Sequence, residues 1–251
     1  MPEVSSYEPG TFCWVELATS DAKAGQKFYT SLFGWDVKEN SMGDQGIYYT
    51  FQKKGKDVGA MYDEKNAPPH WNSYVSVANV DASAEKAKKL GGRVVNGPFD
   101  AMDLGRMAAI RDPQDASFSL WQPKKNIGAT VINEPGALCW NELMTNDINA
   151  ARKFYTGLFG WKLKESPEYT EANVGDQPTG GMMQITKEMK GMKPNWKPYF
   201  AVSDVDATAK KVKSAGGQIH QPPADIPKVG RFSIVSDPQG ASFALITLSP
   251  Q

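Results

Sequence analysis

The sequence predicts an α+β fold in which four βαβββ modules form two half-barrel domains in one chain. The chain length, an internal duplication and a recurring order of elements support this prediction. The 251 residues suffice for two domains of roughly 125 residues each. Residues 9–39 and 135–165 are identical at 19 of 31 aligned positions, which establishes a tandem repeat. Later segments of the two halves also match, beginning at Tyr74 and Tyr199 and at Leu104 and Val229.

The first module opens with a strand and continues into a helix. Residues 12–19 alternate in polarity, a pattern typical of a half-buried strand. Ser20-Asp21 is expected to cap a helix at 22–33, whose apolar side chains share one face, and Gly34 to end it. Three strands are then expected near residues 35–40, 47–52 and 57–62.

The second module repeats this order of elements. A strand at 73–79 precedes a helix at 81–90, which ends at Gly91-Gly92. Two modules are expected to pair in each half, because a unit of about 55 residues buries little apolar surface alone. The remaining strands of this module are expected at 93–97, 106–112 and 116–121.

The duplication also predicts the domain boundaries. The first domain is expected to span residues 8–123 and the second 136–249. Residues 124–135 have no periodic apolar face and end in Pro135, as a linker between domains would.

Composition excludes several classes of partner. Lys and Arg number 28 and Asp and Glu also 28, so the formal net charge is zero and neither nucleic acid nor an anionic membrane is an expected partner. No apolar run approaches the roughly 18 residues of a membrane span, and the first ten residues do not resemble a secretion signal. With only Cys13 and Cys139, no disulfide framework is expected, which indicates a cytoplasmic protein.

Motifs in both halves give the chain a family resemblance. Asp21 precedes Phe28-Tyr29 in the helix, the helix ends in Leu32-Phe33-Gly34-Trp35, and Asp112-Pro113 precedes the last strand. With the repeated βαβββ order, these motifs resemble the vicinal oxygen chelate superfamily of glyoxalase I, bleomycin-resistance proteins and extradiol dioxygenases. The resemblance implies two glyoxalase-like domains. It also implies a monomer, because four modules in one chain can pair where smaller relatives dimerise.

The resemblance further implies where a metal would bind. Metal-dependent members of the superfamily hold a divalent cation with carboxylate, His or Gln side chains from the inner face of the sheet. This chain has only two histidines, His70 and His220, and neither lies on those positions. Indole, alkyl and ammonium groups are not metal ligands, so no metal or other cofactor is expected, with a divalent metal as the disfavoured alternative. The expected ligand positions hold Trp14, Asn72 and Ser119 in the first half, and Trp140, Lys197 and Ala244 in the second.

Strand alternation predicts what lines the inner face instead. Cys13, Val15 and Leu17 are apolar and are expected to face the helices. The alternate residues, including Trp14 and Glu16, are then expected to line an amphipathic cup for a small organic ligand. The predicted ligand-binding residues are Trp14, Glu16, Tyr74, Ser119 and Trp121 in the first cup, and Trp140, Glu142, Met144 and Tyr199 in the second.

Two carboxylates are the candidate catalytic groups. Glu16 and Glu142 inside aromatic cups would be partly desolvated, which raises the pKa and suits a general base. The alternative is a structural role, in which each carboxylate pairs with Arg106 or Arg231 or accepts a hydrogen bond from a tyrosine. Cys13 is expected to be an inert residue of the core.

Three functions remain open from the sequence. The first is a metal-independent protein, similar to bleomycin-resistance proteins, that binds a small organic molecule. The second is an enzyme, a lyase or isomerase or one similar to the dioxygenases, that acts on a carbonyl or vicinal-oxygen metabolite with Glu16 or Glu142 as acid or base. The third is a structural protein whose cups are filled by their own side chains.

Overall fold

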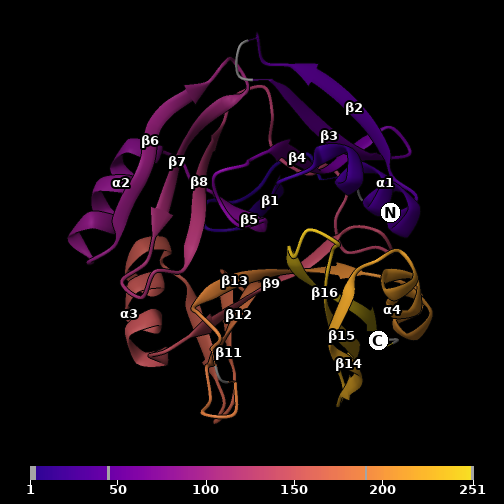
Figure 1. Ribbon diagram of the computed structural model, residues 1–251. Coiled ribbons are helices and arrows are strands. Elements are labelled where there is room, and N and C mark those ends of the chain that lie inside the picture. Colours follow the sequence, from indigo (N-terminus) through magenta and orange to yellow (C-terminus); the bar gives the residue numbers. More distant parts are fainter. Residues whose placement is uncertain (1–3, 44–45, 190, 250–251) are drawn as a thin grey trace.

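A computed structural model describes residues 4–43, 46–189 and 191–249. It confirms the α+β fold of four βαβββ modules, arranged as two eight-stranded sheets (Figure 1). The first sheet comprises β1 (Phe12–Thr19), β2 (Asp36–Ser41), β3 (Ile47–Lys53), β4 (Lys56–Asp63), β5 (His70–Ser76), β6 (Arg93–Ala101), β7 (Gly105–Arg111) and β8 (Ser117–Pro123), with helices α1 (Ala22–Phe33) and α2 (Val80–Lys89).

The second sheet repeats the first. It comprises β9 (Leu138–Thr145), β10 (Lys162–Glu165), β11 (Thr170–Val174), β12 (Gln177–Gln184), β13 (Asn195–Ala201), β14 (Gln218–Ile226), β15 (Gly230–Ser236) and β16 (Ser242–Leu248), with helices α3 (Ile148–Phe159) and α4 (Val205–Ser214). Both sheets have the same strand order, β2-β3-β4-β1-β5-β8-β7-β6 and its equivalent, so the first strands of paired modules lie side by side. None of the helices in the described residues is long and apolar enough to cross a membrane.

The helix ends follow the expected capping chemistry. Asp21 has an extended backbone, and its carboxylate accepts a hydrogen bond from the Ala24 N–H at 3.0 Å. Gly34 closes α1 with φ of 69°, a left-handed conformation that glycine adopts without steric cost.

Each hydrophobic core is shared between the two domains. The helix α1 and the inner strand β1 pack with α4, β13 and β16, while α2 packs with α3 and β9 in a second core. Tyr29 on α1 donates a hydrogen bond to Asp237 at 3.0 Å, and Tyr155 on α3 donates an equivalent bond to Asp112. The modules therefore pair in two ways, within a domain through the sheet and between domains through the helices.

A β-bulge in β1 corrects one predicted orientation. Phe12 pairs with Val75 and Trp14 pairs with Tyr74, so Cys13 is an extra residue on its strand. Cys13 consequently packs with Trp14 and Tyr74 on the inner side of the sheet and does not face the helices as expected. Val15 and Leu17, beyond the bulge, do face the helices.

The connection between the domains packs against the first sheet. Ala129 donates a backbone hydrogen bond to Cys13 at 2.8 Å, and its carbonyl accepts one from the Tyr7 hydroxyl at 2.7 Å. Ala129 and Ile132 join the cluster around Trp14. The first cup therefore has part of its wall from the connecting segment.

Candidate functional site

The first cup is centred on Glu16, which emerges from the middle of β1 on the side away from the helices. The Tyr48 hydroxyl donates a hydrogen bond to Glu16 Oε2 at 2.7 Å, and the Tyr74 hydroxyl donates to Oε1 at 2.8 Å. The Trp14 indole N–H donates to the Tyr48 hydroxyl at 3.3 Å. Both carboxylate oxygens therefore have a phenolic donor.

The second cup reproduces this network around Glu142. The Tyr199 hydroxyl donates to Glu142 Oε1 at 2.8 Å, and the Trp140 indole donates to the Tyr169 hydroxyl at 2.8 Å. The Tyr169 hydroxyl lies near enough to Glu142 to lower the pKa of its carboxyl group. Gly181 permits this arrangement, because a Cβ atom there would lie 1.8 Å from the Tyr169 oxygen. The two halves thus repeat the side chains, the bond from indole to phenol and one bond from phenol to carboxylate.

Burial controls the proton affinity of both carboxyl groups. Loss of hydration raises the pKa of Glu16, and the hydrogen bonds from Tyr48 and Tyr74 partly oppose this rise. The pKa of Glu142 is also raised by burial, with Tyr199 and the nearby Lys197 charge opposing. A carboxyl group with a raised pKa can accept or release a proton nearer neutral pH.

The other predicted residues surround these carboxylates. Ser119 accepts a hydrogen bond from the Asn72 amide at 2.8 Å, and Trp121 packs edge-on against Tyr74 at 6.3 Å between ring centroids. Met144 follows Trp140 and Glu142 at alternate positions of β9 and is 5% exposed. The structure thus brings together the predicted residues of each cup.

Two tyrosines of the cups were not predicted from the sequence. Tyr48 and Tyr169 lie on β3 and just before β11, far in sequence from the glutamates they contact. Aligning Gly59 with Gly180 brings these tyrosines to equivalent positions in the two halves. This alignment of the two halves is the sequence signal that could have identified Tyr48 and Tyr169 as residues of the cups.

The predicted pairing of the two glutamates with Arg106 and Arg231 is wrong. Arg106 pairs with Asp81 at 2.7 Å and with Asp100, and Arg231 makes the equivalent pair with Asp206. Each arginine therefore links the start of a helix to the edge of a sheet and does not reach a glutamate. In the described structure, only tyrosine hydroxyls donate hydrogen bonds to Glu16.

The cysteines are unsuited to nucleophilic chemistry. Burial raises the pKa of the Cys139 thiol to about 12 and that of Cys13 further. His70 begins β5 and is exposed, and His220 contacts Ser236 on the neighbouring strand.

The donor set of the cups does not fit a divalent metal. Among the described residues, no group of three or more His, Cys, Asp and Glu side chains is placed so that it could hold a metal ion. In the first cup Glu16 is surrounded by hydroxyl donors and an indole, which has no lone pair to share. In the second, Lys197 places an ammonium group near Glu142, which would repel a cation.

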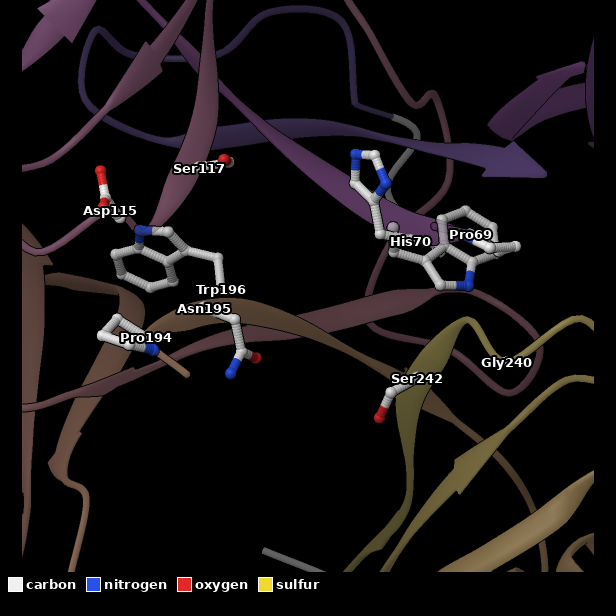
Figure 2. A pocket seen from close by; sticks show the side chains of 10 residues that line it. Pro69, His70, Asp115, Ser117, Pro194, Asn195, Trp196, Gly240 and Ser242 are labelled. Atoms are coloured by element: carbon white, nitrogen blue, oxygen red, sulfur yellow. The ribbon is translucent and has the colours of Figure 1, made fainter. Parts of the chain in front are cut away.

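A separate cavity lies between the two domains. It has a volume of about 280 Å³, and Figure 2 shows side chains of both domains around it. Trp71 and Ser117 of the first domain correspond to Trp196 and Ser242 of the second, so the cavity lies where the repeats meet. His70 is also among the residues that line the cavity.

Comparisons with known proteins agree with this fold. The profile of the Glyoxalase/Bleomycin resistance protein/Dioxygenase superfamily matches residues 11–119 and 137–245. "Putative glyoxylase CFP32" of Mycobacterium tuberculosis (strain CDC 1551 / Oshkosh) is 43% identical, covering 100% of both chains. "Anthracycline biosynthesis protein DnrV" of Streptomyces peucetius is 33% identical, covering 98% of this chain and 96% of that protein. The Mn(II)-bound glyoxalase from Novosphingobium aromaticivorans has a TM-score of 0.67 at 14% identity, covering 95% of this chain and 82% of that chain, a likeness of fold.

Proposed function

Because the chain belongs to the Glyoxalase/Bleomycin resistance protein/Dioxygenase superfamily, we propose that it binds small organic molecules in its two cups without a metal ion. The observation that carries this proposal is the repeated network of one indole, two phenols and one carboxylate. Trp140 and Tyr169 are partly exposed, so a ligand can reach their rings. Aromatic walls with a few fixed polar groups favour planar organic ligands.

A relative gives this ligand class independent support. The protein DnrV carries the name of anthracycline biosynthesis, and it is 33% identical to this chain. A fused-ring molecule would stack on an indole and accept or donate hydrogen bonds at its oxygens. We extend to this chain only the class, a planar organic molecule with polar substituents. The chain is proposed to act as a monomer, since its four modules bury their helices against one another.

The second candidate function is proton transfer within a cup. Its supporting observation is the raised pKa of Glu142 together with a second polar group, Lys197, on the neighbouring strand. A lyase or isomerase acting on a carbonyl metabolite would use Glu142 as the base. Proton transfer predicts that Glu142→Gln loses turnover but retains ligand binding, whereas a binding role predicts a change in affinity alone.

The binding function predicts an effect of removing both indoles. The neutral fluorescent probe phenyl-naphthylamine is expected to bind the wild type, and the double variant Trp14→Ala, Trp140→Ala to bind it roughly tenfold more weakly, because a stacking surface is lost from each cup. Probe fluorescence measures this affinity. Val229→Ala, an exposed apolar position between β14 and β15, is the control and should bind as the wild type does. Equal affinity in the double variant would exclude the cups as the binding site.

A further inference from the structure

The two cups differ in charge at one equivalent pair of positions. Asn72 on β5 lies opposite Glu16, and Lys197 on β13 lies opposite Glu142. The first cup therefore carries one formal negative charge from this pair of positions, while the second carries one charge of each sign. An approaching anion thus meets a more favourable potential in the second cup.

Lys197 is directed at the second cup by the alternation of β13. Tyr199, two residues later, donates its hydroxyl to Glu142, and no register shift separates these two strand positions. Trp196, the residue before Lys197, lies on the opposite side, in the core around α3. Lys197 is therefore on the same side as Tyr199, and it is only 6% exposed.

The neighbours of Lys197 leave its ammonium group available. In the first cup, Asn72 donates its amide to Ser119, whereas Ala244 at the position equivalent to Ser119 has no side-chain acceptor. In the described parts of the chain, no hydrogen bond and no ion pair within 4 Å joins the Lys197 ammonium to another side chain. Its interaction with Glu142 is a longer-range attraction. Three N–H donors thus remain for a ligand.

We propose that the second cup selects organic anions through Lys197, and that the first cup does not. The ligand class is a planar or small organic molecule bearing a carboxylate, sulfonate or similar anionic oxygen. Its rings lie against Trp140 and its anionic group accepts hydrogen bonds from the Lys197 ammonium. A buried ammonium that lacks a bonded counter-ion is costly, and a ligand anion removes that cost. This inference rests on the proposed binding function and assigns its ligand charge.

Two probes with the same ring system test the assignment. Anilinonaphthalene sulfonate carries an anionic group, and phenyl-naphthylamine lacks it. Lys197→Asn makes the second cup resemble the first at this position. We expect this variant to bind the sulfonate about tenfold more weakly and to bind the neutral probe with affinity within about twofold of wild type. The reciprocal variant Asn72→Lys is expected to increase the number of sulfonate sites by one, measured by calorimetric titration.

Matched controls separate this effect from changes in net charge and folding. Lys153→Asn makes the same substitution at an exposed position of α3 and is expected to bind both probes as the wild type does. Lys197→Arg retains the charge and should retain preference for the sulfonate. Both probes binding Lys197→Asn as they bind wild type, or both weakening equally, would overturn the assignment but not the proposed function. Failure of both probes to bind the wild type would instead overturn the proposed function, and this inference with it.

Discussion

Trp35→Ala is expected to destabilise the whole chain by about 3–5 kcal/mol while retaining a single unfolding transition. Trp35 follows α1 and is 3% exposed. Its ring packs against Phe51 of its own domain at 4.9 Å and against Phe200 of the other domain at 5.6 Å between centroids. Its indole N–H also donates to the Gly136 carbonyl at 2.7 Å. The substitution therefore leaves a cavity and an unpaired carbonyl in a core that both domains share.

The duplication supplies a matched variant in the other core. Trp161 donates to the Gly10 carbonyl at 2.8 Å and packs against Tyr155 and Trp196. Trp161→Ala should therefore cost a similar free energy of unfolding. Urea denaturation followed by circular dichroism measures both losses. Two separate transitions in Trp35→Ala, with one unchanged from wild type, would show that the domains fold independently and contradict the shared cores.

Tyr199→Phe is expected to destabilise the protein by about 1.5–3 kcal/mol near neutral pH, the range for a hydrogen bond to a charged group. The variant removes a donor from Glu142, a carboxyl group that is 8% exposed. Because the Tyr199 hydroxyl lowers the pKa of Glu142, its loss raises that pKa further above the unfolded value.

The pH dependence of this effect follows from linkage. A carboxyl group with a raised folded-state pKa contributes stability below its unfolded pKa, about 4.3, and loses it as pH rises through the folded value. A further rise in the Glu142 pKa enlarges that loss, so Tyr199→Phe should destabilise more at neutral pH than near pH 4. Chemical denaturation at both pH values measures this difference. Tyr74→Phe, which removes a donor from Glu16, should show the same dependence of stability on pH. Tyr49→Phe is the control and should change the free energy of unfolding by less than about 0.5 kcal/mol at either pH.

The sequence predicted the fold because its duplication is visible residue by residue. The four copies of the module have the same order of elements. The capping residues Asp21 and Gly34 indicated where the first helix begins and ends. The inward orientation of Trp14 and Glu16 followed from strand alternation alone, a local property of the backbone. These predictions needed no knowledge of long-range contacts.

The unpredicted features depend on contacts between distant segments. The bulge at Cys13 shifts the alternation by one residue, and a bulge leaves no reliable mark in a single sequence. Tyr48 on β3 reaches Glu16 across β4, the strand that lies between β3 and β1 in the sheet. Arg106 has acidic partners on α2 and β6, a choice that depends on how the helix lies against the sheet edge. Residues 124–135 were predicted to be a linker because they have no periodic apolar face. In the structure, Ala129 of this segment packs in the cluster around Trp14.

A carboxyl-carbon NMR titration tests the central claim that Glu16 and Glu142 lie inside ligand-accessible aromatic cups. Glu16→Gln and Glu142→Gln assign the two resonances. We expect both to titrate above the ordinary glutamate range, and the Glu142 resonance to shift when phenyl-naphthylamine is added. Two glutamates that titrate near the ordinary value of about 4.3 and do not respond to the probe would contradict the account.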